Sequence, residues 1–200
     1  VFLLSTFYYL LSTIYAATID SVYRYAWNDV IGWIDFGYSA GNVNVYSNRL
    51  EGYASSSVGF IALNCNSTPN NDICSGPSGN WRVSNNGNGY LSGWAYNDGI
   101  GWISFDSATA GSPYTYQVVI DSVSGEFSGW AWNENVGWIS FNCNQSEIGN
   151  TCALPEGPGS STYKVKTNWN AVPISGNLTS SVFDSQATGG AAINSIMWKG

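Results

Sequence analysis

Three stretches of the chain carry nearly the same twelve residues: YAWNDVIGWIDF at 25–36, WAYNDGIGWISF at 94–105 and WAWNENVGWISF at 130–141. A degenerate copy, YASSSVGFIAL at 53–63, is one residue shorter in its middle. Four copies in 200 residues indicate one supersecondary unit repeated in tandem. The second and fourth copies are each followed by two cysteines, which indicates a duplicated pair of units.

The fourth copy predicts the structure of one unit. Residues 116–120 are rich in β-branched side chains, and the apolar runs 126–133 and 138–141 follow after short stretches rich in Asp, Ser, Asn and Gly. Such runs favour strands, and such small polar residues favour tight turns. We therefore expect an antiparallel three-stranded meander in each repeat. Beyond residue 17 no stretch keeps an apolar period of 3.6 residues, so the predicted fold class is all-β with almost no helix.

Alternation along these strands sorts the side chains into two faces, because successive residues of a strand point to opposite sides. In the fourth copy one predicted face holds Phe127, Ala131, Ile139 and Phe141, and the other holds Trp130, Trp132 and Trp138. A sheet with two apolar faces must be covered on both. We expect the repeats to pack as a β-sandwich or a stacked array, with the aliphatic face against another sheet.

The aromatic face has two interpretations. Rings that recur in every copy are favoured as packing residues, because each buries a large area against its neighbours. Alternatively, rings beside Asn, Asp and Ser side chains suit a sugar, which has an apolar face and a polar rim. Under that second interpretation the candidate ligand-binding residues are Trp27, Trp94, Tyr96, Trp130 and Trp132.

The polar residues of the repeat are expected to shape turns. Asn and Asp side chains bond their own backbone at turns, and glycine supplies backbone conformations with positive φ. The positions concerned are Asn28, Asn97 and Asn133, the acids Asp29, Asp98 and Glu134, and glycines 32, 101 and 137. A glycosidase needs two carboxyls facing each other across a cleft, and repeated turn acids do not predict that. We expect no catalytic residues, no cofactor and no metal site.

The four cysteines predict two local disulfides, Cys65–Cys74 and Cys143–Cys152, since each pair encloses a short loop of the same length. A zinc site is the less favoured alternative, because it would have to join two remote loops. Disulfides imply an oxidising compartment. Both loops begin with a glycosylation sequon, at Asn66 and Asn144, and a third lies at Asn177.

The N-terminus and the charge balance indicate an exported protein. Residues 1–17 are uncharged and apolar and end in Tyr-Ala-Ala, which predicts a secretory signal peptide. A retained N-terminal segment, as in a pilin-like filament subunit, is the competing interpretation. With 13 acidic residues, 6 basic residues and no histidine, the chain lacks the cationic footprint for nucleic acid and the imidazole of Ser-His-Asp catalysis.

Composition also divides the chain. Residues 18–152 form the repeat region, and 153–161, with two prolines and two glycines, form a predicted linker. Residues 162–200 contain three strand-like runs. We interpret them as the beginning of a truncated β-sandwich-like second domain.

The phrase GWAWNENVGWISF, at 129–141, is similar to tandem repeats of large exported surface proteins of small-genome bacteria. The resemblance covers residues 18–152, and it extends less securely to the tail. It implies a signal peptide, several repeats, downstream β-sandwich modules and a cell-surface location. It supplies no catalytic residues.

These observations together predict a secreted, non-catalytic cell-surface protein with a structural or adhesive role. Its expected partner is a cell-surface polysaccharide or a neighbouring surface protein, and the chain spans no membrane unless residues 1–17 are retained. A carbohydrate-binding module using exposed aromatic rings is the first alternative. A filament subunit and a polysaccharide-degrading enzyme are the others.

Overall fold

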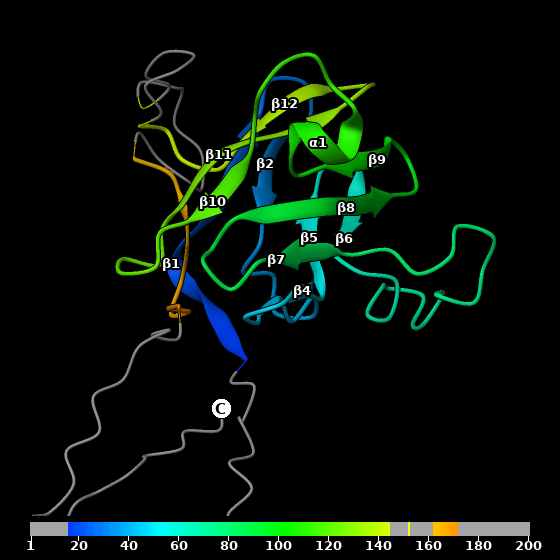
Figure 1. Cartoon of the computed structure of the whole chain (residues 1–200), viewed down its shortest axis with the longest axis horizontal. Coiled ribbons are helices and arrows are strands. Elements are labelled where there is room, and N and C mark those ends of the chain that lie inside the picture. The colour runs from blue at the N-terminus through cyan, green and yellow to red at the C-terminus, as the bar shows by residue number, and fades with distance from the viewer. Residues whose placement is uncertain (1–15, 145–151, 153–161, 172–200) are drawn as a thin grey trace, which may run out of the picture.

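The computed structural model describes residues 16–144, 152 and 162–171, and Figure 1 shows the arrangement of the elements. The strands are β1 (Ala17–Asn28), β2 (Gly32–Asp35), β3 (Asn44–Val45), β4 (Leu50–Glu51), β5 (Tyr53–Ser56), β6 (Gly59–Ala62), β7 (Val83–Asn85), β8 (Leu91–Asn97), β9 (Gly101–Ser104), β10 (Val118–Ile120), β11 (Phe127–Asn133), β12 (Gly137–Ser140) and β13 (Val165–Thr167). One short helix, α1 (Ser107–Ala110), lies among them. The all-β fold class is confirmed.

Eight of these strands form a closed antiparallel barrel. Each repeat contributes one hairpin: β1–β2 is the first, β5–β6 the second, β8–β9 the third and β11–β12 the fourth. Neighbouring hairpins pair through β2–β5, β6–β8 and β9–β11, and β12 pairs with β1 to complete the ring. The predicted order β10–β11–β12 is present. The predicted sandwich or stacked array is not confirmed, because the sheet covers its aliphatic face by closing on itself.

The four junctions between hairpins share one register. The last aromatic position on the first strand of one hairpin faces the serine position of the hairpin before it, as in the pairs Trp132 with Ser104 and Trp27 with Ser140. The second hairpin keeps this register although it carries Ser55, which faces Asp35. The barrel is therefore a four-fold pseudo-symmetric ring that includes its degenerate member.

The inward-facing apolar side chains of all four hairpins fill the barrel. The side chains that fill it are Ala26, Ile34, Phe36, Ala54, Ile61, Leu63, Ala95, Ile103, Phe105, Ala131, Ile139 and Phe141, none more than 2% exposed. A barrel of eight strands has an interior just wide enough for side chains to fill. The turn residues Ile31, Ile100 and Val136 are buried with this core, whereas Val58, on the shorter turn of the second hairpin, is exposed. Any ligand site must therefore lie outside the barrel.

In three of the four hairpins a buried asparagine connects the hairpin to the one before it. The Asn133 Nδ2 donates to the carbonyls of Ile100 (2.9 Å) and Trp102 (2.8 Å), and its Oδ1 accepts from the amides of Asn135 and Val136. Asn28 and Asn97 form the same four bonds in their own hairpins, and we call these three side chains the asparagine bridges. Asn28 bonds Val136, Trp138, Val30 and Ile31, and Asn97 bonds Val58, Phe60, Gly99 and Ile100.

The second hairpin has no asparagine at this position and uses a serine. The Ser57 Oγ donates to the Ile31 carbonyl at 2.7 Å, so a side-chain bond also joins the second hairpin to the first. The predicted backbone role of the asparagines is confirmed, and their bonds across the junctions are an addition to it. Glycines 32, 101 and 137 have φ of 72°, 78° and 77°, as predicted.

The described part of the tail packs on the barrel. Strand β13 pairs with β1, and Trp169 belongs to the hydrophobic core of the barrel. Lys164 forms an ion pair with Glu126 at 2.7 Å. Residues 1–15, 153–161 and 172–200 lie outside the described residues, so the signal peptide at 1–17, the linker at 153–161 and the second domain at 162–200 stay predictions.

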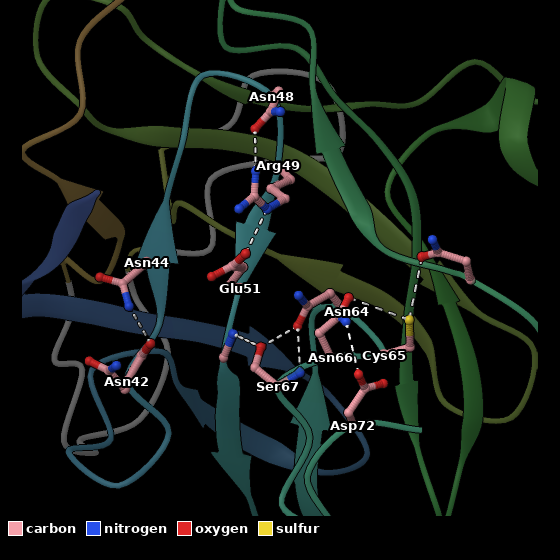
Figure 2. Close-up of polar contacts among 12 residues, drawn as sticks. Asn42, Asn44, Asn48, Arg49, Glu51, Asn64, Cys65, Asn66, Ser67 and Asp72 are labelled. Carbon is pink, nitrogen blue, oxygen red and sulfur yellow. Dashed lines mark hydrogen bonds and ion pairs between the residues drawn. The ribbon is translucent and has the colours of Figure 1, made fainter. Parts of the chain in front are cut away.

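The two predicted disulfides are present, with Cα atoms 4.9 Å apart in Cys65–Cys74 and 4.6 Å apart in Cys143–Cys152. Figure 2 shows how the first loop is anchored: Ser67 accepts from the Gly52 amide at 2.6 Å and hydrogen-bonds Asn64. The exposed sequon residue Asn66 donates to Asp72 at 3.3 Å. Asn144 is exposed as well, and Asn177 lies outside the described residues.

Candidate functional site

The repeated aromatic rings lie on the outside of the barrel. In the first, third and fourth hairpins a central ring contacts two rings on the paired strand, whereas in the second hairpin Phe60 contacts one, Tyr53. Trp102 lies 6.1 Å from Trp94 and 4.9 Å from Tyr96, measured between ring centroids. Trp138 lies 6.4 Å from Trp130 and 4.6 Å from Trp132. Edge-to-face pairs at such distances contribute about 0.5–1.5 kcal/mol each beyond the area they bury, so the rings stabilise the hairpins.

A ring from another segment also contacts the central ring of every hairpin. The segment that follows one hairpin supplies the ring for the next, and the segment after the fourth hairpin supplies it for the first. The pairs and their centroid distances are Tyr38 with Phe60 (5.6 Å), Trp81 with Trp102 (5.3 Å), Tyr116 with Trp138 (5.0 Å) and Tyr163 with Trp33 (5.2 Å). Part of the aromatic surface is therefore covered by the chain itself.

Between the third and fourth hairpins this cover is incomplete. A cavity of about 820 Å³ lies over β9 and β11, beside α1 and the residues that follow it. We call it the aromatic groove; its rings are Trp94, Trp102, Trp132, Trp138 and Tyr114, and its polar residues include Ser112, Asn133, Glu134 and Asn135. Its volume is within the range of small-molecule sites.

The structure distributes the five predicted ligand-binding residues over different faces. Only Trp94 and Trp132 line the aromatic groove. Tyr96 packs beside Trp81 at 6.1 Å, and Trp27 lies on the first hairpin. Trp130 is 9% exposed, and its Nε1 has no hydrogen-bond partner among the described residues. The five residues do not form one site.

Sequence reasoning placed Trp102 and Trp138 on the aromatic face but did not select them as ligand residues, and it missed Tyr114. Trp102 is 36% exposed, and Tyr114, on the loop after α1, is 72% exposed. The exposed Tyr114 lies outside the repeat, so no pattern pointed to it. The groove depends on which neighbouring segment covers which hairpin, and the repeat motif does not encode that.

The polar rim of the groove differs from the matching part of the first hairpin. There the Trp27 Nε1 donates to Asp29 at 2.9 Å. The matching residues of the fourth hairpin are Trp132 and Glu134, and the described residues supply neither the indole N–H of Trp132 nor the exposed carboxylate of Glu134 with a hydrogen-bond partner. A donor and an acceptor on the groove are therefore available to a ligand.

The electrostatics of the groove are simple. No lysine or arginine is among its lining residues, and Glu134 is the one acid there. Behind its floor the Tyr116 hydroxyl hydrogen-bonds the buried Ser104, and burial raises the pKa of Tyr116. Within residues 16–144, 152 and 162–171, no three His, Cys, Asp or Glu side chains gather as they would around a metal ion.

Among the described residues, no helix has the length and hydrophobicity needed to cross a membrane. Comparisons with models of protein families, with curated proteins and with solved structures found no match to this chain. The resemblance to exported repeat proteins therefore stays a prediction, and the function must be argued from the groove.

Proposed function

We propose that this chain is a secreted, non-catalytic cell-surface module with a structural and adhesive role, and that it holds its partner in the aromatic groove. The observation that carries the proposal is the groove itself: four indoles and an exposed tyrosine gather at one incompletely covered junction on the outside of a filled barrel. Exposed apolar surface of this kind marks interaction sites.

The barrel supports a structural role. Its filled interior, its asparagine bridges and its two disulfides resist local opening, because buried packing and stapled loops restrict the unfolded chain and the partly open states. Disulfides form and persist in oxidising compartments, so the two disulfides agree with the proposed export. A rigid barrel presents the groove residues in one fixed arrangement, which reduces the ordering cost of binding.

The absence of catalysis is part of the proposal. The turn acids of the repeat, Asp29, Asp98 and Glu134, lie at equivalent turns of three different hairpins. Of these three, only Glu134 lines the groove. Hydrolysis of a glycosidic bond uses two carboxyl groups on either side of the scissile bond. The groove offers the geometry to hold a ligand and one carboxylate to orient it.

The test measures retention and turnover in one assay. Purified full-length chain is incubated with bacterial cell envelopes, and both the bound fraction and the reducing ends released into solution are followed. We expect retention without any time-dependent release. Tyr114→Ala reduces retention by about fivefold, which corresponds to a loss of about 1 kcal/mol of binding free energy when an interface ring is truncated.

Tyr90→Ala is the matched control, because Tyr90 is 48% exposed and does not line the groove. Retention that falls equally in both variants, or in neither, contradicts the groove as the adhesive surface. Time-dependent release of sugar contradicts the non-catalytic role. Recovery of the chain inside the cells of a secreting bacterial host, with residues 1–17 intact, contradicts export.

A further inference from the structure

The aromatic groove has the chemistry of one particular class of ligand, and we infer that it binds a single chain of neutral pyranose sugars. The inference rests on the proposed adhesive function and names its ligand. A pyranose has C–H groups on the faces of its ring and hydroxyls around the edge. A site that recognises it needs apolar ring surface together with a few well-placed donors and acceptors.

The angles between the rings indicate a chain held in a cleft. Trp94 and Trp102 are inclined at 68°, and Trp132 and Trp138 at 61°. Rings inclined so steeply cannot form a flat strip that matches the surface of a crystalline polymer. All four rings line the groove between the third and fourth hairpins, and its volume of about 820 Å³ suits a short stretch of one chain. This geometry favours soluble or amorphous glycan over a crystal face.

The polar groups of the groove suit sugar hydroxyls. The indole N–H of Trp132 is available as a donor and the Glu134 carboxylate as an acceptor, and both belong to the turn end of the fourth hairpin. A hydroxyl both donates and accepts, so one sugar ring can satisfy the two groups together. The matching Trp27 and Asp29 bond each other at 2.9 Å and leave no such pair for a ligand.

Charge selects among glycans. Acidic sugars are usually held by Arg or Lys, whose side chains match a carboxylate or sulfate. No such side chain lines the groove, and the chain carries a formal net charge of −7. An anionic glycan would meet Glu134 and the negative protein without a counter-charge. A neutral glycan loses nothing to this repulsion.

The experiment titrates the full chain with soluble oligosaccharides and follows both calorimetry and tryptophan fluorescence. The neutral probes are cellohexaose, mannohexaose and N-acetylchitohexaose, and the charged probes are hexagalacturonate and deacetylated chitohexaose. We expect at least one neutral probe to bind with a change in fluorescence, because Trp94, Trp102 and Trp132 line the groove. Hexagalacturonate binds at least tenfold more weakly. If cellohexaose is a probe that binds, microcrystalline cellulose retains less protein than amorphous cellulose.

Matched pairs of variants locate the site. Tyr114→Ala weakens the binding of the neutral probe by about fivefold, whereas Tyr90→Ala leaves its affinity unchanged. Of these two tyrosines, only Tyr114 lines the groove. Glu134→Ala weakens it by about three- to tenfold, as loss of a charged acceptor does. Asp98→Ala, at the matching turn of the third hairpin, has no effect, since Asp98 is exposed and outside the groove.

The following results would overturn the inference. Equal or tighter binding of hexagalacturonate removes the charge argument. Tighter binding of deacetylated chitohexaose that weakens steeply with salt assigns the groove to cations. If no sugar binds while Tyr114→Ala still lowers retention on cell envelopes, the adhesive function stands and the glycan inference fails. If neither measurement responds to Tyr114, both fail.

Discussion

The first and fourth hairpins meet where β12 pairs with β1 and closes the barrel, and they carry nearly the same phrase. Inside the barrel they are equivalent: Ala26 and Ile34 match Ala131 and Ile139, and all four side chains are buried. Outside they differ. Trp27 is hydrogen-bonded to its own turn acid, whereas Trp132 and Glu134 both line the aromatic groove without a hydrogen bond between them.

This difference separates what the repeat needs for folding from what it leaves variable. The interior residues and the asparagine bridge recur in both hairpins because the closed ring depends on them. The indole N–H and the turn acid at the end of the outer face can differ between the two hairpins, because neither group forms a hydrogen bond across a junction among the described residues. A ligand site can therefore arise at one junction without any cost to the others.

The largest expected difference between the two hairpins concerns Gly129 and its counterpart Arg24. Gly129 has φ of 84°, and a Cβ there would lie 1.8 Å from the Gln117 carbonyl oxygen. Gly129→Ala should destabilise the protein by about 4 kcal/mol, through a backbone clash and an unfavourable φ. Arg24→Ala should cost about 1 kcal/mol, because the ion pair with Asp35 and the bonds to the Tyr25 hydroxyl and the Gly37 carbonyl that it removes are all partly exposed. Urea denaturation measures both, and equal losses would contradict the comparison.

The asparagine bridges should be equal in the two hairpins. Asn28→Ala and Asn133→Ala each remove four hydrogen bonds from a residue only 1% exposed, so each should lower the free energy of unfolding by about 3 kcal/mol. Ser57→Ala, which removes one bond at the second hairpin, should cost about 1 kcal/mol. Asn28 forms the bridge at the junction that closes the ring. If Asn28→Ala lowers the free energy of unfolding far less than Asn133→Ala does, the ring is not closed in solution.

The hairpins could be predicted from the sequence, but their closure into a barrel could not. Alternation along the strands identified the face of Ala131 and Ile139, because a strand has a period of two residues. It assigned that face to contact with a second sheet, since nothing local in the phrase states that the last hairpin pairs with the first. The pairing of Asn28 with Ile139 joins positions more than a hundred residues apart, and only the geometry of the whole ring determines it.

The sequence predicted that a ligand site would be made of aromatic rings. It did not predict where on the barrel the aromatic groove lies. The candidate rings were chosen because they repeat, and repetition identified Trp94 and Trp132 together with Trp130, which is buried. The most exposed ring of the groove, Tyr114, does not repeat. Its position depends on the loop after α1, whose course no periodic pattern encodes.

A reciprocal exchange of turn acids would sharpen the comparison at the outer face. Glu134→Asp shortens the acid of the fourth hairpin to the length that bonds the indole of Trp27 in the first. We expect the new carboxylate to accept from Trp132, to stabilise the protein by about 0.5–1 kcal/mol and to weaken the neutral sugar probe by about threefold. Asp29→Glu should lower stability by a similar amount and leave sugar binding unchanged. Thermal unfolding and calorimetry measure the two effects, and unchanged binding in Glu134→Asp would contradict the role of the free pair.

The smallest expected difference is in the pH dependence of the two regions. Burial raises the pKa of Asp35 in the first hairpin, although Arg24 at 3.0 Å opposes the shift. Bonds from Ser124 and Val123 lower the pKa of Asp121, in the turn before the fourth hairpin. The native state thus binds the proton of Asp35 more tightly than the unfolded chain does, and that of Asp121 less tightly.

The signs of the two contributions follow from this difference. Stability from Asp121 is fully present above its unfolded pKa near 3.8 and is lost as the pH falls through its lower native value. Asp35 acts in the opposite sense: its contribution declines as the pH rises from 3.8 through its higher native pKa. Asp121→Asn should therefore flatten the stability profile below about pH 4, and Asp35→Asn should flatten it above about pH 4, each by less than about 1 kcal/mol because both groups are partly screened by solvent. Urea midpoints measured from pH 2 to pH 7 separate the two variants, and changes of the same sign in both would show that the two carboxyls do not differ in this way.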